Sequence, residues 1–403
     1  MTIAQDARSA SSTQPARTKV LSRLAHDRRV RDAVLQIIVL GAVVALIAYL
    51  VGNASAALKA RGIASGFGYL SQEAGFGIGE SLFLTYSPSD TYFRAFAVGL
   101  INTLRVSILA IIAATLIGLV FGLMRLSSNL GASKLAAGYV ELFRNTPQLL
   151  QIVFWYAVMT GLPRPRQAIS PGGDIYLSNR GLILPWPVPH SAYLWAFVAL
   201  ITGVLGAMLL TRWARGVQAR TGELPNVAHW RIALIVGLPI IAWALTGAPT
   251  EIERPALRGL NFTGGVTLSP EFVALFLGLA LYTGAFIAEI VRSGVESVSR
   301  GQVEAARSLG LSQNQIYRLV LIPQALRVMI PPTAGQYVSL AKSSSLAVVI
   351  GYPDLVNVSN TTLNQTGHVV EALVLMSAVY LLISFSIAAA MNLYNRAVAI
   401  KER

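Results

Sequence analysis

The sequence predicts an all-α membrane protein with about eight transmembrane helices, and two observations carry this prediction. Of the 403 residues, 54% are hydrophobic and only 12% are charged, which is about half the charged share of a typical soluble domain. The mean hydropathy is +0.59, and charge-free runs divide the chain into segments that approach the roughly 20 apolar residues needed to cross a bilayer. These features exclude a disordered protein and argue against a soluble enzyme.

Eight segments between charged residues are apolar enough to be predicted as spans. Lys342 and Pro331-Pro332 interrupt the seventh, so a kinked or irregular span is expected there. A signal peptide is the alternative for the first, because Ala54-Ser55-Ala56 fits a cleavage site. The apolar run is longer than the hydrophobic region of a usual signal peptide, and the basic segment before it is long as well. Both features favour an uncleaved helix. In order, the spans are 34–52, 106–124, 145–163, 192–211, 232–250, 272–288, 328–350 and 372–395.

The basic residues predict the orientation of these spans. Residues 1–33 hold seven Lys and Arg residues, which places this N-terminus in the cytoplasm by the positive-inside rule. Eight crossings return the tail, 396–403, to the same side. Cytoplasmic segments then carry 22 Lys and Arg residues and outer segments carry 7. The net charge of +14 is therefore an orientation signal rather than a nucleic-acid-binding surface.

The residue inventory excludes several kinds of chemistry. The chain has no cysteine, so disulfides, thiolate catalysis and cysteine-based metal sites are excluded. Its four histidines are scattered at no ligand spacing, and no metal site is expected. The phosphate-binding motif GxxxxGK[ST] does not occur, so the chain is not predicted to be an ATPase or another enzyme.

The segment between the sixth and seventh spans has strong local signals. Residues 302–309 are good helix formers, and Gly310 is a natural C-terminal stop. Ser312 is a suitable cap for a second helix, which is expected to end at Leu321 before Pro323. The segment therefore predicts two short helices joined by a turn, on the cytoplasmic side of the membrane.

The same segment carries a resemblance to a known family. Glu304-Ala305-Ala306 is followed after three residues by Gly310, and after nine more by Val320-Leu321-Ile322-Pro323. This string resembles the EAA-x3-G-x9-I-x-L-P loop of ABC importer permeases, with Val320 and Ile322 as conservative replacements. The resemblance implies that the coupling loop, 293–323, fits a cleft on an ATPase. The residues implied in this coupling are Gly301, Glu304, Ala305, Ala306, Gly310 and Pro323.

Other parts of the chain resemble the polar amino acid subfamily of these permeases. Residues 139–156 and the string Asn102-Thr103-Leu104 fit that subfamily. The resemblance implies a five-helix core made of 94–160 and 270–395, with an extra N-terminal helix at 34–52. The block 161–269, with an outer loop rich in Pro and Gly and two spans, is an insertion into that core. Such long permeases are similar to the general L-amino acid and glutamate/glutamine/aspartate/asparagine transporters of Gram-negative bacteria.

This resemblance implies partners and a location. The expected partners are a second, different permease subunit, two ATP-binding cassette ATPase subunits, a periplasmic amino-acid-binding protein and the lipid bilayer, but not nucleic acid. ATP and magnesium are expected to be used by the partner ATPase, and no cofactor is expected on this chain. The expected location is the inner membrane of a Gram-negative bacterium.

Lys342 and the serines after it are candidate residues of the translocation path. A charge inside an apolar span is costly and commonly marks a pathway or an internal pair. The alternatives are a lysine that reaches the membrane interface, or a structural hydrogen-bond centre. The string Lys342-Ser343-Ser344-Ser345-Leu346 resembles the subfamily's Lys-Asp-Thr-Ser-Leu element, with serines in place of the usual Asp and Thr.

Three further features have structural interpretations. Glu289 is expected to pair with Arg292 on the same helix face. Arg105 bounds the second span and is expected to act as an interface anchor. Gly118 and Gly122 form a GxxxG pattern, which is expected to allow close helix packing within the subunit.

The predicted function is thus the permease subunit of an ABC importer for polar or general L-amino acids. The first alternative is a secondary amino acid transporter driven by an ion gradient, which would be expected to have midmembrane carboxylates and two related halves. A second alternative is a membrane-embedded transferase or phosphatase, which would need clustered Asp, Glu or His. The sequence shows neither set of features.

Overall fold

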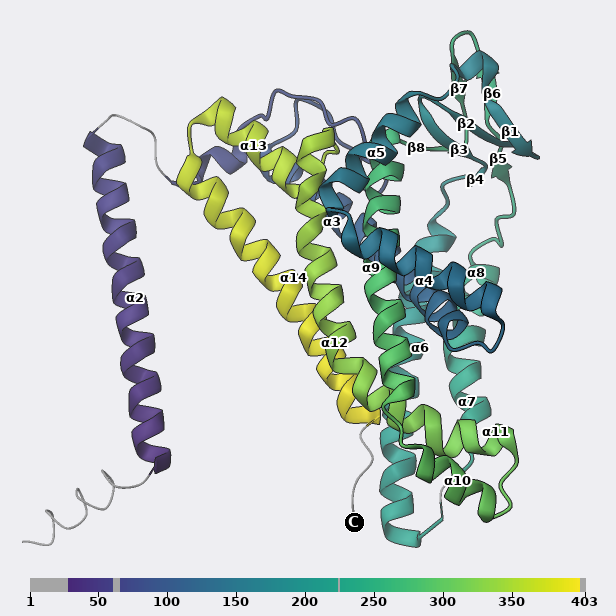
Figure 1. Cartoon of the computed structure of the whole chain (residues 1–403). Coiled ribbons are helices and arrows are strands. Elements are labelled where there is room, and N and C mark those ends of the chain that lie inside the picture. Colours follow the sequence, from purple (N-terminus) through teal and green to yellow (C-terminus); the bar gives the residue numbers. More distant parts are fainter. Residues whose placement is uncertain (1–27, 61–65, 224, 399–403) are drawn as a thin grey trace, which may run out of the picture. The chain divides into compact units, whose positions relative to one another are not determined.

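The computed structural model describes residues 28–60, 66–223 and 225–398, most of which are helical as predicted (Figure 1). The predicted basic N-terminus, 1–33, lies outside the described residues up to residue 27, and the predicted tail, 396–403, lies outside them after residue 398. The chain divides into two units, which are residues 1–69 with 362–372 and residues 70–361 with 373–403.

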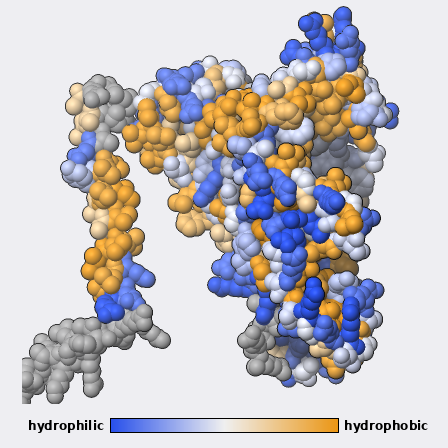
Figure 2. All heavy atoms as spheres, in the orientation of Figure 1, coloured by the Kyte–Doolittle hydropathy of each residue, from blue (hydrophilic) through white to orange (hydrophobic). Residues whose placement is uncertain are grey.

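The first unit contains the N-terminal helix. Helix α2 (Arg28–Ala60) includes the predicted span 34–52 and has apolar side chains exposed along that length (Figure 2). Elsewhere in this unit, the ring of Tyr69 in η1 (Phe67–Ser71) stacks on His368 with 4.6 Å between ring centroids. The Gly66 amide donates a hydrogen bond to Glu371 Oε1 at 2.6 Å. Residues 66–69 are thus tied to residues 368–371.

The second unit contains most of the predicted five-helix core and the predicted insertion. Helices α13 (Leu355–Thr366) and α14 (Val369–Val398) each run through a boundary between the units. The other helical elements are α3 (Tyr92–Arg125), α4 (Leu130–Asn145), α5 (Gln148–Thr160), η2 (Pro165–Gln167), α6 (Ser191–Thr221), α7 (Ala228–Ile232), η3 (Ala233–Gly237), α8 (Leu238–Leu245), α9 (Pro270–Glu296), α10 (Arg300–Ser308), α11 (Gln313–Ile316), η4 (Tyr317–Leu321), α12 (Ile322–Ser343) and η5 (Ser344–Ile350).

Six helical segments in the described part of the chain are long and apolar enough to cross a membrane. They coincide with six of the eight predicted spans. The predicted span 145–163 is the shorter apolar helix α5, which has 13 residues. The predicted span 328–350 is irregular as expected, because α12 contains Pro331 and Pro332 and gives way to the 3-10 helix η5 directly after Lys342 and Ser343. By length and composition, the described part of the chain therefore has six helices that could cross a membrane, and the predicted number of eight is not confirmed.

The Pro- and Gly-rich loop of the predicted insertion, and the segment before α9, contain short strands that the sequence prediction did not include. Strands β3 and β8 pair antiparallel, with Leu182 opposite Leu268, although more than 80 residues separate them in sequence. Figure 1 shows these strands gathered beside the N-terminal end of α9. The four-stranded sheet has the order β1-β2-β3-β8, and β4 pairs with β5 and β6 with β7. The strands are β1 (Ile169–Gly172), β2 (Ile175–Ser178), β3 (Gly181–Leu184), β4 (Trp186–Pro187), β5 (Ile252–Glu253), β6 (Ala256–Arg258), β7 (Asn261–Thr263) and β8 (Val266–Leu268).

Helix α9 lies at the centre of the apolar core. It contacts α3, α4, α5 and α12. Leu275 and Leu279 of α9 are fully buried and pack in one cluster with Val106 of α3, Ile152 of α5 and Leu340 of α12. Protein interiors are closely packed, so the helices that pack against α9 are held in fixed positions relative to it. Helix α9 is therefore the central element of the core.

Glycines allow α3 and α9 to approach closely, as the GxxxG pattern predicts. A Cβ atom at Gly118 would lie 2.5 Å from Ile287 of α9, and one at Gly122 would lie 2.7 Å from Val291. Gly284 on α9 similarly faces Ile117 of α3, at 2.9 Å. The pattern therefore serves packing within the subunit, which confirms the sequence interpretation.

Asp354 is a buried carboxyl at the start of α13. Its Oδ1 atom accepts a hydrogen bond from the Asn357 amide at 2.8 Å, and its Oδ2 accepts one from the Tyr380 hydroxyl at 3.3 Å. The residue is 0% exposed. Burial is the main cause that raises the pKa of the Asp354 carboxyl to about 7.

A leucine at Gly118 is expected to destabilise the protein by about 1–3 kcal/mol, because its side chain would overpack the interface between α3 and α9. The change is measured as a lower unfolding temperature of the purified protein in detergent. Gly138→Leu is the matched control, since nothing lies within 4 Å of a Cβ atom at Gly138 in α4. Equal unfolding temperatures for the two variants would contradict this account of the packing.

The stability contributed by Asp354 is expected to depend on pH. Its pKa is higher in the folded protein than in the unfolded chain, so the folded state binds more protons and stability falls as pH rises from about 4 to about 7. Asp354→Asn keeps a capping side chain but does not titrate. The unfolding temperature of the wild type relative to this variant should therefore fall over that range. A difference that stays constant with pH would refute this assignment.

Candidate functional site

The predicted coupling loop, 293–323, forms the two-helix arrangement that its sequence predicts. Helix α10 ends at Ser308, and Gly310 has a φ of +78°, a left-handed conformation that favours glycine. The Ser312 amide donates to Gln315 Oε1 at 2.8 Å as α11 begins. The positions of the helix stop and of the cap are thus confirmed.

The second helix of the loop does not stop where it was predicted to stop. Helical backbone continues from α11 through the π-helical turn η4 into α12. The expected end at Leu321 before Pro323 is therefore wrong. Pro323 lies in the first turn of α12, directly after the π turn, where the missing N–H of proline is tolerated. The loop and the span α12 consequently form one connected helical element.

Helix α10 presents most of its predicted coupling residues on its surface. Ala306 is 5% exposed and packs inward, where α10 contacts α11 and η4. Gly301, Glu304, Ala305 and Gly310 are exposed. Leu309, beside them, is 81% exposed, which is unusual for a leucine. The segment therefore offers small side chains and one large apolar side chain to a partner surface.

A carboxylate at the C-terminal part of α9 joins three helices. Glu289 Oε1 accepts from Arg292 Nη2 at 2.5 Å, which confirms the predicted pair. Glu289 also forms an ion pair with Arg125 at the end of α3, and Arg144 of α4 lies 3.9 Å from it. We call Glu289 and these three arginines the Glu289 cluster. The sequence identified only the local pair, because no spacing rule connects α9 with α3 or α4.

Lys342 and its neighbouring serines lie where α12 passes into η5. Lys342 is exposed, and its ammonium group has no ion pair within the described ranges. Ser343 is half-buried. Ser344 is buried and donates to the Ala341 carbonyl at 2.7 Å, and Ser345 donates to the Lys342 carbonyl at 2.7 Å. Two of the serines are thus satisfied by the local backbone, whereas the lysine is left to meet another group.

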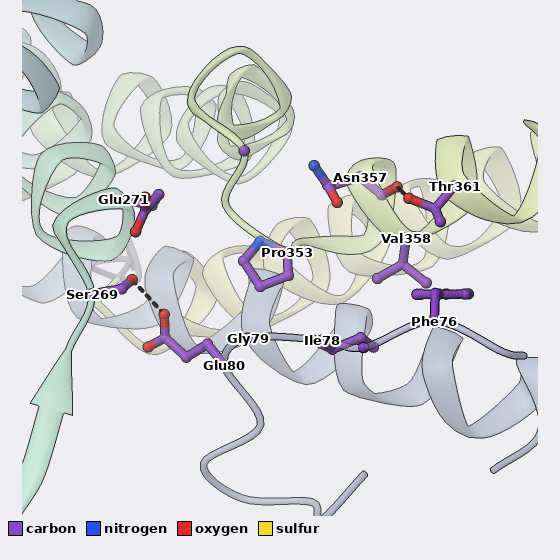
Figure 3. Close-up of a pocket in the computed structure, with 12 residues that line it drawn as sticks. Phe76, Ile78, Gly79, Glu80, Ser269, Glu271, Pro353, Asn357, Val358 and Thr361 are labelled. Carbon is purple, nitrogen blue, oxygen red and sulfur yellow. Dashed lines mark hydrogen bonds between the residues drawn. The ribbon is translucent and has the colours of Figure 1, made fainter. Parts of the chain in front are cut away.

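The N-terminal end of α9 borders a hollow of about 380 Å³ (Figure 3). Residues 76–80, the start of α9, the turn at 351–353 and α13 surround it. Its polar lining includes Glu80, Glu271, Asn357 and Thr361. We call it the Glu80 hollow. It lies at the opposite end of α9 from the coupling loop.

Glu80, which lines this hollow, belongs to a buried ion pair. Glu80 Oε1 lies 2.5 Å from Arg105 Nη1. Glu80 Oε2 accepts a hydrogen bond from Ser269 Oγ at 2.6 Å, which Figure 3 shows as a dashed line. The guanidinium of Arg105 lies 4.2 Å from the ring centroid of Phe272. Arg105 is only 8% exposed, so its predicted role as an interface anchor is wrong. No sequence pattern predicts the role of Glu80, because a single acid in a glycine-rich segment indicates no partner 25 residues away.

The remaining acid of the hollow is available to a ligand. Glu271 Oε1 accepts from the Tyr156 hydroxyl at 3.2 Å, and its side chain is only half-buried. A carboxylate in this setting can receive an ammonium group or other donor. No group of three or more His, Asp or Glu side chains in the described part of the chain could hold a metal ion.

Comparisons with known proteins identify the family of this chain. Residues 220–400 match the family described as binding-protein-dependent transport system inner membrane component. The chain is 48% identical over 378 residues to the putative amino-acid ABC transporter permease protein YhdX of Escherichia coli (strain K12), covering 93% of this chain and 95% of the relative. It is 42% identical over 379 residues to the general L-amino acid transport system permease protein AapQ of Rhizobium johnstonii, covering 94% of each.

A third relative also matches over nearly the whole chain. The glutamate/glutamine/aspartate/asparagine transport system permease protein BztB of Rhodobacter capsulatus is 38% identical over 416 residues, covering 95% of this chain and 97% of the relative. These matches run through the insertion as well as the core. They confirm the predicted resemblance and support the permease interpretation rather than a secondary transporter. The chain belongs to the family of amino-acid ABC transporter permeases, which are multi-span membrane subunits whose ATP is hydrolysed by a separate subunit.

Proposed function

We propose that this chain and a second, different permease subunit form the membrane pathway of an importer for polar or general L-amino acids. The exposed face of α10 carries the proposal, because its small side chains and Leu309 suit a cleft on an ATPase. Two ATPase subunits bind and hydrolyse ATP with magnesium, and a periplasmic binding protein supplies the amino acid. The membrane is the inner membrane of a Gram-negative bacterium, with both termini in the cytoplasm.

The mechanism that we propose uses α9 and the coupling loop. Closure of the ATPase pair moves α10, which follows directly after α9 and is continuous with α12 through α11 and η4. Movement of these helices opens the path between the two permease subunits alternately to each side. Lys342 meets the substrate carboxylate along the path, with Ser343, Ser344 and Ser345 shaping the surrounding backbone.

The central test is transport by the reconstituted complex. The chain is co-expressed with its ATPase and the second permease, and the complex is placed in liposomes with the binding protein. We expect uptake that requires ATP and that a panel of L-amino acids inhibits to different extents. Uptake that proceeds without ATP, driven by an ion gradient, would contradict the proposal. Two differently tagged copies of this chain that co-purify in one complex would contradict the pairing with a different subunit.

Gly310→Val is expected to uncouple ATP hydrolysis from uptake. A β-branched residue at a φ of +78° costs about 1–2 kcal/mol and displaces the turn after α10. Uptake should fall by about tenfold or more, while the protein still inserts and the ATPase keeps its basal rate. Gly222→Val is the matched control, since Gly222 ends α6 with a φ of +79° and lies outside the coupling loop. Normal uptake by Gly310→Val at normal expression would refute the role of this loop.

Lys342→Gln is expected to weaken uptake without uncoupling the ATPase. Loss of a charged hydrogen bond to a substrate carboxylate costs about 1.5–3 kcal/mol, so the KM for uptake should rise by about 10- to 100-fold. Lys342→Arg should retain more activity, and Lys134→Gln, an exposed lysine of α4, should have no effect. An unchanged KM in Lys342→Gln would show that this lysine does not meet substrate.

A further inference from the structure

The insertion contains a basic cleft that the transport path does not use. Three segments line this hollow of about 720 Å³: residues 162–167, which follow α5 and include η2, the turn between β2 and β3, and the turn between β6 and β7. Three exposed arginines, Arg164, Arg166 and Arg180, belong to its lining. We call this hollow the arginine cleft.

One backbone hydrogen bond and one side-chain hydrogen bond hold the three segments together. The Asn179 amide donates to the Pro163 carbonyl at 2.9 Å, and Arg166 Nε donates to the Gly259 carbonyl at 3.2 Å. The ring of Tyr176 on β2 lies 4.5 Å from that of Phe262 on β7. The arginines are therefore carried on a folded frame, so little backbone entropy is lost when they bind a partner.

The arginine cleft has an excess of positive charge. In the described part of the chain no carboxylate forms an ion pair with Arg164, Arg166 or Arg180. By contrast, Arg254 of the same insertion lies 3.5 Å from Asp174. A guanidinium presents a planar fork of donors that matches a carboxylate. The cleft is thus complementary to a surface rich in Asp and Glu.

The position of the cleft favours a soluble partner over a lipid headgroup. Figure 1 places the β6–β7 pair beyond the four-stranded sheet, away from the long helices, and Figure 2 shows hydrophilic residues gathered at that end. The sheet itself stands at the N-terminal end of α9, opposite the coupling loop. A partner seated there contacts the face away from the ATPase.

The cleft is also close to the Glu80 hollow. A further hollow of about 340 Å³ is lined by Arg180 on one side and by Glu80 and Ser269 on the other. Arg180 therefore borders both the arginine cleft and the approach to the N-terminal end of α9. A protein held by the arginines would lie beside that end of the permease.

We propose that the arginine cleft docks an acidic surface of the binding protein. The inference rests on the proposed function, in which a binding protein supplies the amino acid, and the matched family is described as binding-protein-dependent. Long-range attraction between the arginines and the acidic surface speeds encounter and fixes the orientation of the docked protein.

The test uses the complete complex in lipid nanodiscs, with purified binding protein added. The readout is the binding-protein concentration that gives half-maximal stimulation of ATP hydrolysis. For Arg164→Glu/Arg180→Glu we expect this concentration to rise by about tenfold or more and to depend less on salt, because two attractive charges become repulsive. The maximal rate should stay that of the wild type, since neither residue lies near the coupling loop.

Arg258→Glu is the matched control, because Arg258 is an equally exposed arginine of β6 that does not line the cleft. An unchanged half-maximal concentration in the double variant, with the wild type stimulated normally, would overturn the docking inference alone. A wild-type complex that no binding protein stimulates would instead refute the proposed function.

A second measurement identifies the occupant directly. The chain has no cysteine, so Arg180→Cys provides a single attachment point for a photoactivated crosslinker. We expect crosslinks to the binding protein, and fewer of them as salt is raised. Crosslinks to lipid alone, or stimulation that depends on anionic lipid rather than on the arginines, would overturn the inference in favour of a headgroup site.

Discussion

The close packing of α9 against α3 is the constraint on which the rest of the structure depends. Ile287 and Val291 of α9 lie so close to Gly118 and Gly122 of α3 that no side chain would fit at either glycine. The backbones of the two helices therefore approach closely, and this close packing fixes how α9 is placed along α3. Helix α9 then extends from the Glu80 hollow at its N-terminal end to the Glu289 cluster near its C-terminal end. Both polar regions are positioned by an apolar core that contains no charge.

The polar groups at the two ends of α9 follow one physical rule. A charge removed from water is tolerated only when another charge and further hydrogen bonds accompany it. At one end Glu80 is held by Arg105 and Ser269, and at the other Glu289 is held by arginines of three helices. The first pair also fastens residues 76–80 to α3, so these ion pairs define where helices and connecting segments meet.

Local signals in the sequence predicted the helix stop and the cap of the predicted coupling loop. Contacts between residues far apart in the sequence could not be predicted in this way. Gly310, the cap at Ser312 and the pair of Glu289 with Arg292 depend on residues within one turn, where helix geometry gives definite spacings. Glu80 and Arg105 meet only because the chain folds back, and the pairing of β3 with β8 crosses the whole insertion. Those strands have three or four residues each among Pro and Gly, too few for an alternating pattern to stand out. The sequence prediction ended the helix before Pro323. In the structure, a π turn directly before α12 lets the helix continue with Pro323 in the first turn of α12.

The predicted insertion, 161–269, makes most of its helix contacts within itself and meets the core through its sheet. Its two long helical segments pack chiefly on each other: α6 contacts α8 and η3, and a Cβ atom at Gly203 would lie 2.1 Å from the Leu234 carbonyl oxygen. Its sheet meets the core through β8, which is separated from α9 only by Ser269. The sheet of the insertion, α9 and the predicted coupling loop therefore follow one another along the chain with only short connections between them. A partner on the sheet and a partner on α10 would therefore act on opposite ends of the same helix.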